Sequence, residues 1–172
     1  VEGEKMSKSL GNTVLAHDLV RDHAGETLRL ALLSAHYRQP LDWTAHGIQQ
    51  AKKYLDRLYQ ILRLSADFPV DQSVELPPSV MEALCDDLNM PMVLAAINDL
   101  TRDEKDKAVL KSRLLKIGAL LGILQQDPAQ WLGYAAAAAD GDAAAIEARL
   151  AQRQAAKKEK NFALADQIRK EL

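Results

Sequence analysis

The sequence predicts an all-α protein built as a helical bundle. Apolar residues recur every three or four positions along most of the 172 residues, and no stretch beyond the first few residues alternates between apolar and polar as a strand would. Residues that cap or stop helices stand between these apolar segments, such as Thr44, Asn89 and Asp142 as N-caps and Pro40 as a stop. These patterns together predict helix after helix around a shared core.

The first half of the chain predicts three helices behind an N-terminal loop. A short amphipathic helix is expected over residues 14–23, and a second over residues 25–38, where Pro40 disfavours its continuation. Thr44 is placed to cap a long third helix. The apolar face of that helix consists of Ile48, Ala51, Leu55, Leu58, Ile61 and Leu62. Residues 68–78 hold three of the six prolines and predict a linker.

The second half predicts six further helices. They are expected over residues 79–88, 92–100, 108–124, 128–133, 142–159 and 161–172. Asn89 can cap the second of these, and Pro91 suits the first turn of a helix because its missing N–H is not needed there.

Composition is that of an ordinary soluble protein, with 48% hydrophobic and 27% charged residues. No apolar run approaches membrane-spanning length, so no membrane partner is expected. The net charge of −2 means that any nucleic-acid surface must be a local patch. The single cysteine, Cys85, excludes an internal disulfide, fits a reducing compartment, and is expected to be a small buried hydrophobe. The four histidines show no ligand spacing with it, so we predict no metal in this chain.

The stretch KMSKSLGN, residues 5–12, predicts a phosphate-handling loop. Lys5 and Lys8 are three residues apart, so that in a turn both ammonium groups point to one side, and Ser7 and Ser9 add hydroxyl donors. Such groups would stabilise the charge that develops as pyrophosphate leaves a triphosphate. A bare pair of lysines at this spacing is usually a solvated basic turn, so the interpretation depends on the full octet.

A basic segment near the C-terminus is a candidate for binding nucleic-acid phosphates. Residues 147–172 carry seven basic and four acidic side chains, a local charge of +3. Five of the basic residues lie on or beside one expected helix face: Arg149, Arg153, Lys157, Lys158 and Lys160. The spacing of these residues alone does not exclude that the segment is an ordinary helix with solvated charges.

The octet resembles the KMSKS loop of class I aminoacyl-tRNA synthetases. Three later segments, residues 32–42 (LLSAHYRQPLD), 86–91 (DDLNMP) and 149–172, are similar in the same order to segments of cysteinyl-tRNA synthetase. The chain is thereby identified as a member of that family, as a C-terminal part that starts at the KMSKS loop. The resemblance implies the loop and stem-contact-fold helices over residues 1–68. It implies a helical anticodon-binding domain over residues 69–172, without the usual extreme C-terminus.

The resemblance also implies a chemistry. The family activates L-cysteine with ATP, in the presence of Mg, to cysteinyl-adenylate and transfers it to tRNA(Cys) in the cytoplasm. Lys8 is then the ATP-contacting lysine, Lys5 assists it, and Ser7 and Ser9 shape the loop. Zinc and the nucleotide-binding domain are expected outside this chain, which would be a monomer and inactive alone.

Contacts with tRNA are implied for Arg38 and for the five basic residues of the C-terminal segment. For Arg38 the alternative is that it caps the end of its helix. Two other functions stay open: the ligase that joins cysteine to an amino sugar in mycothiol synthesis, and a non-catalytic tRNA-binding module.

Overall fold

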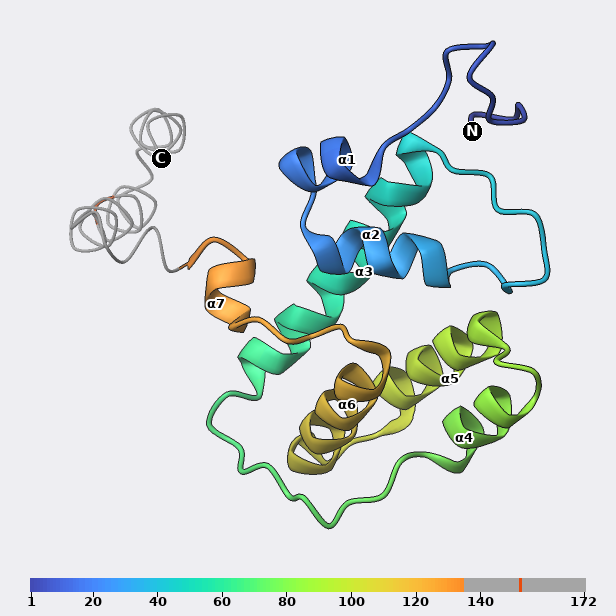
Figure 1. Ribbon diagram of the computed structural model, residues 1–172. Coiled ribbons are helices and arrows are strands. Elements are labelled where there is room, and N and C mark those ends of the chain that lie inside the picture. Colours follow the sequence, from blue (N-terminus) through green and yellow to red (C-terminus); the bar gives the residue numbers. More distant parts are fainter. Residues whose placement is uncertain (135–151, 153–172) are drawn as a thin grey trace, which may run out of the picture. The chain divides into compact units, whose positions relative to one another are not determined.

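The computed structural model describes residues 1–134 and Gln152. Residues 1–128 form one compact unit, and a second unit begins at Ala129. The regular structure of the described residues is helical, without a strand, which confirms the all-α class there (Figure 1). The helices are α1 Ala16–Asp22, α2 Gly25–Leu33, α3 Ala45–Leu64, α4 Pro78–Cys85, α5 Met90–Asp103, α6 Lys107–Leu121 and α7 Pro128–Trp131. The helices expected over residues 142–159 and 161–172 lie outside the described residues.

Two predicted N-caps are confirmed. The side-chain oxygen of Thr44 accepts a hydrogen bond of 2.9 Å from the backbone N–H of Gly47 at the start of α3. The side chain of Asn89 accepts one of 3.3 Å from Met92 N–H at the start of α5. Each bond satisfies one of the donors that the first turn of a helix leaves without a partner.

The helices α2, α4 and α6 end well before the predicted residue, each for a reason in the backbone. α2 ends at Leu33, and a turn follows in which Gln39 N–H donates to His36 C=O over 2.8 Å. α4 ends at Cys85 because Asp87 and Leu88 adopt the left-handed region, at φ 52° and 54°.

The end of α6 was marked in the sequence by Gly122. This glycine adopts φ 69°, and Ile123 N–H then donates to the carbonyl of Gly118 over 2.9 Å. A left-handed glycine of this kind commonly closes a helix, so α6 stops at Leu121 rather than at residue 124.

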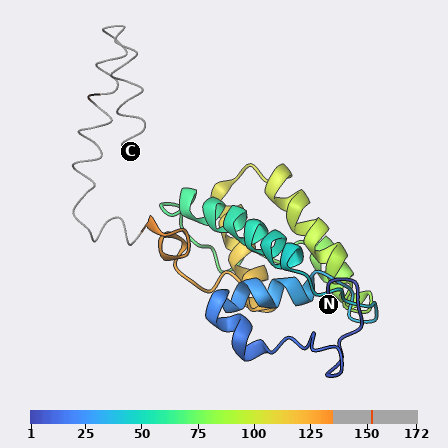
Figure 2. The ribbon, with the colours of Figure 1, turned by 90° about the horizontal axis from the view of Figure 1, so that it is seen from above.

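The core forms around α3. α2 packs along α3, α4 packs on α5, and α6 contacts both α3 and α5. Figure 2 shows α3 running between α2 and α5, and the hydroxyl of Tyr54 on α3 donates to the carbonyl of Leu94 on α5 over 3.2 Å. Of the apolar face predicted for α3, Ile61 is half-buried. The other members are buried: Ile48, Ala51, Leu55, Leu58 and Leu62. Each buried leucine contributes about 1.5–3 kcal/mol of hydrophobic free energy.

The predicted linker, residues 68–78, has no helix before Pro78, but it is fastened to α6. The ammonium group of Lys111 donates to the carbonyls of Ala66 and Phe68 over 2.8 and 2.7 Å. Residues on both sides of the expected boundary at residue 68 therefore belong to the same compact unit. The functional division at that residue stays a prediction.

One expectation about the core is wrong. Cys85 is exposed, because it occupies the last turn of α4 just before the left-handed residues that end the helix. It is not the small buried hydrophobe that its residue type favours.

Candidate functional site

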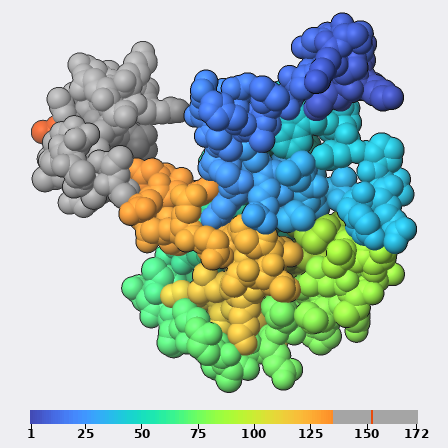
Figure 3. Space-filling model, viewed as in Figure 1, coloured from blue at the N-terminus to red at the C-terminus, as the bar shows by residue number. Residues whose placement is uncertain are grey.

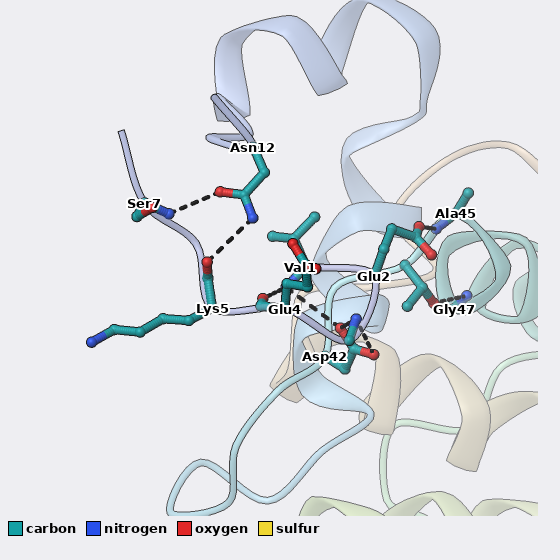
Figure 4. Close-up of polar contacts among 11 residues, drawn as sticks. Val1, Glu2, Glu4, Lys5, Ser7, Asn12, Asp42, Ala45 and Gly47 are labelled. Atoms are coloured by element: carbon teal, nitrogen blue, oxygen red, sulfur yellow. Dashed lines mark hydrogen bonds and ion pairs between the residues drawn. The ribbon is translucent and has the colours of Figure 1, made fainter. Parts of the chain in front are cut away.

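The N-terminal octet forms a loop that is closed by the side chain of Asn12. Its carboxamide oxygen accepts a hydrogen bond of 2.8 Å from Ser7 N–H, and its amide nitrogen donates one of 3.2 Å to the carbonyl of Lys5 (Figure 4). One planar side chain thus holds two points of the loop at once. The sequence marks Asn12 only as the end of the octet, so its role as a bridge was missed.

The two serines shape the turn inside this loop. The hydroxyl oxygen of Ser7 accepts from Leu10 N–H over 3.2 Å and lies 3.2 Å from the hydroxyl oxygen of Ser9. Gly11 N–H donates to the carbonyl of Lys8 over 3.2 Å, and Gly11 itself adopts φ 67°, a conformation that glycine reaches without strain.

Both lysines of the loop are exposed. Within the part of the chain that the structure describes, the ammonium groups of Lys5 and Lys8 have no hydrogen-bond or ion-pair partner. Figure 4 shows the side chain of Lys5 extending away from the hydrogen bonds that close the loop. The loop lies at an edge of the compact unit (Figure 3). The arrangement therefore offers two cationic groups on a backbone that is internally fixed.

The base of the loop is tied to the start of α3. Gly3 N–H donates to both carboxylate oxygens of Asp42, over 3.0 and 3.1 Å. Glu2 N–H donates to the carbonyl of Trp43 over 3.1 Å, and the Glu2 carboxylate accepts from Ala45 N–H over 2.9 Å (Figure 4). Glu2 and Asp42 were not among the predicted site residues, since nothing in the sequence pattern brings them together.

An apolar groove of about 790 Å³ lies next to the loop. Met6, Leu32, Leu41 and Trp43 are among its lining residues, and Lys5 also lines it. The candidate site therefore combines the two exposed lysines of the loop with an apolar surface next to it.

Arg38 lies in the turn after α2 and is paired with Asp87 from the connection between α4 and α5. The Arg38 Nε lies 2.7 Å from one carboxylate oxygen of Asp87, and the hydroxyl of Tyr37 donates to the other over 2.6 Å. These two donors, first Tyr37 and then Arg38, hold the pKa of Asp87 below its usual value. The expectation that Arg38 caps a helix end is wrong, because α2 ends at Leu33 and Arg38 faces a carboxylate.

The other predicted tRNA contacts fall outside the described residues. These are Arg149, Arg153, Lys157, Lys158 and Lys160. Over the described part of the chain, no group of three or more His, Cys, Asp or Glu side chains is arranged to hold a metal ion. None of the helices described there is both long and apolar enough to cross a membrane.

Comparison with known proteins finds a family model that is similar to the N-terminal part of this chain. Residues 1–53, which include the whole loop, α1, α2 and the start of α3, match the family described as tRNA synthetases class I (C) catalytic domain. The match therefore covers the candidate site and its connection to α3.

Curated relatives of this chain share one name. A protein of Rhodospirillum rubrum named Cysteine–tRNA ligase is 50% identical over 181 aligned residues, covering 100% of this chain and 39% of that protein. Proteins with the same name from Parvibaculum lavamentivorans and Caulobacter vibrioides are 49% and 48% identical. These alignments cover 37% and 39% of the two relatives, and 96% and 100% of this chain. The chain thus spans about two fifths of the length of these relatives.

Proposed function

We propose that this chain is part of a cysteine–tRNA ligase, an enzyme that activates L-cysteine with ATP and transfers the cysteinyl group to tRNA(Cys). The observation that carries the proposal is the closed loop of residues 5–12, which presents two exposed lysines without partners among the described residues. The match of residues 1–53 to the class I catalytic-domain family supports it. So does the name of the relatives that align over the whole chain. That name favours tRNA charging over the amino-sugar ligase and over a non-catalytic module.

In this proposal the chain supplies one side of the active site and a tRNA-binding arm. It is the C-terminal part of the ligase, from the KMSKS loop onward. Residues 1–68 contribute the loop and the stem-contact-fold helices, and residues 69–172 the anticodon-binding domain. The cysteine pocket, the zinc that it requires and most of the ATP site belong to a nucleotide-binding domain outside this chain. The isolated chain is therefore inactive, and the complete enzyme works as a cytoplasmic monomer.

The chemical step assigns Lys8 its role. A carboxylate oxygen of cysteine attacks the α-phosphorus of ATP, the bond from that phosphorus to the bridging oxygen breaks, and its electron pair leaves with pyrophosphate. Magnesium bound to ATP would neutralise part of the phosphate charge. The ammonium group of Lys8 stabilises the negative charge that grows on the departing pyrophosphate, and Lys5 assists. Because Ser7 and Asn12 fix the loop backbone internally, little reorganisation is needed at that moment.

Contacts with tRNA are the second part of the proposal. Tyr37 and Asp87 engage the Nε and Nη2 atoms of Arg38, which leaves Nη1 of the guanidinium for a phosphate of the tRNA. The five basic residues of the C-terminal segment would add phosphate contacts that hold the tRNA without reading its sequence.

Cysteine-dependent pyrophosphate exchange by the full-length ligase tests the proposal. Lys8→Ala should lower kcat by roughly 10²–10³, the effect of removing one donor that acts in the transition state. Lys53→Ala, an exposed lysine on α3, is the matched control and should leave kcat within about twofold. A Lys8→Ala effect confined to KM would mean that the lysine only binds substrate, which contradicts the proposed role. Exchange activity in the isolated 172 residues would show that the chain does not depend on another domain.

A further inference from the structure

Hydrogen bonds from three backbone N–H groups join the base of the lysine loop to the start of α3. We call them the loop clamp: Gly3 N–H to the Asp42 carboxylate, Glu2 N–H to the Trp43 carbonyl, and Ala45 N–H to the Glu2 carboxylate. The two residues of each pair are far apart in the sequence. Gly3 and Asp42 are separated by 39 residues, and Glu2 and Ala45 by 43. Figure 4 shows the side chain of Glu2 reaching Ala45, and Asp42 lying beside the base of the loop.

The clamp attaches the loop to a rigid element. α3 has twenty residues, and Leu55, Leu58 and Tyr59 on it are completely buried. The Glu2 carboxylate accepts a hydrogen bond from the first residue of this helix, at the end where the helix dipole favours negative charge. Both carboxylate contacts are charge-assisted, which makes them stronger than hydrogen bonds between neutral groups.

The clamp also fixes an uncommon backbone conformation. Glu2 and Gly3 both adopt left-handed φ values, 51° and 83°. Glutamate rarely adopts this region, so its conformation persists only where surrounding contacts hold it. Lys5 follows two residues after Gly3, and the direction in which the chain enters the loop is therefore set by Glu2, Gly3 and Asp42.

We infer that Asp42 and Glu2 are positioning residues for Lys5 in the adenylation step, an inference that rests on the proposed function. Neither side chain needs to touch substrate. Each acts through the backbone, by holding the loop base where the ammonium group of Lys5 meets the triphosphate. Because a displacement of about 1 Å can cost a hundredfold in rate, releasing one side of the clamp should lower kcat by roughly tenfold.

A double-mutant cycle in the full-length ligase tests this, with kcat for cysteine-dependent pyrophosphate exchange as the readout. Asp42→Ala should lower kcat by roughly tenfold in the wild-type background and by a clearly smaller factor when Lys5→Ala is already present. A purely structural role would lower kcat by the same factor in both backgrounds. Asp42→Asn keeps one acceptor oxygen for Gly3 N–H and should recover most of the lost rate. Asp67→Ala, an exposed aspartate after α3, is the matched control and should leave kcat unchanged.

The outcomes separate this inference from the proposed function. A wild-type ligase without cysteine-dependent exchange overturns the proposed function and the inference with it. An active wild type in which Asp42→Ala has no effect, or the same effect in both backgrounds, overturns the inference alone. So does an active wild type in which Lys5→Ala leaves kcat unchanged. If thermal melting shows that Asp42→Ala does not fold, Glu2→Ala replaces it in the double-mutant cycle with Lys5→Ala. Glu2→Ala removes the other carboxylate of the clamp, so the same outcomes support or overturn the inference.

Discussion

Glu26 on α2 offers the sharpest test of how the compact unit is held together. One oxygen of its carboxylate accepts hydrogen bonds from the Tyr59 hydroxyl over 2.7 Å and from Leu124 N–H over 2.9 Å. The other oxygen accepts from Gln125 N–H over 2.9 Å. Tyr59 is fully buried, and its hydroxyl also accepts from Gln126 N–H over 3.1 Å. A single carboxylate therefore joins α2, α3 and the chain that follows α6.

The cost of losing this carboxylate follows from those three bonds. Glu26→Gln keeps one acceptor oxygen and turns an N–H₂ group toward a donor, so at least one donor loses its partner. We expect a loss of about 2 kcal/mol in the free energy of unfolding, and about 3 kcal/mol for Glu26→Ala, which removes every acceptor. Urea titration followed by circular dichroism measures both values.

The control for this experiment is Glu82→Gln, since Glu82 is exposed on α4. It should change the free energy of unfolding by less than about 0.5 kcal/mol. Combining Glu26→Gln with Tyr59→Phe should show a coupling of about 1 kcal/mol, because the two residues share a hydrogen bond. If Glu26→Gln is as stable as the control variant, the three hydrogen bonds do not contribute as described and the reasoning is refuted.

Two further substitutions test packing and burial. A Cβ atom at Gly118 would lie 2.6 Å from the carbonyl oxygen of Ile123, so Gly118→Ala should cost about 2 kcal/mol in urea titration. The matched Gly25→Ala meets no atom within 4 Å and should be neutral or stabilising by about 0.5 kcal/mol, so equal losses in both variants would contradict the packing argument. Burial raises the pKa of Tyr54 to about 12, which favours the neutral hydroxyl in the folded state. Its contribution to stability is therefore complete below the unfolded pKa near 10 and is lost as pH rises toward 12. Tyr54→Phe should reduce this alkaline loss of unfolding free energy, and an unchanged pH dependence would mean that Tyr54 is not its source.

The local features of the fold could be predicted because they depend on nearby residues. Thr44 and Asn89 cap helices through bonds that span three residues, and the apolar face of α3 follows the helical period. Helix ends were less predictable, because the left-handed conformations of Asp87 and Leu88 have no clear signal in residue type. Gly122 did provide such a signal for α6.

The site could be predicted only in part, for a similar reason. Lys5 and Lys8 lie in one contiguous motif, so the sequence indicates them directly. The loop clamp joins residues about forty positions apart, and nothing in the pattern around Asp42 indicates that it meets Gly3. Arg38 and Asp87 are also far apart in the sequence. Their ion pair joins the turn after α2 to the connection between α4 and α5, and the sequence pattern around Arg38 indicates only a helix end.

In the proposed mechanism, Lys8 acts in the activation of cysteine and not in its transfer. Single-turnover kinetics with the full-length ligase separate the two steps. For Lys8→Ala, the rate of cysteinyl-adenylate formation should fall by roughly 10²–10³, the effect of one lost transition-state donor. The transfer of cysteine from preformed adenylate to tRNA(Cys) should stay within about twofold of wild type, because no pyrophosphate leaves in that step. An unchanged rate of adenylate formation, or an equal fall in both rates, would contradict a role of Lys8 in activation alone.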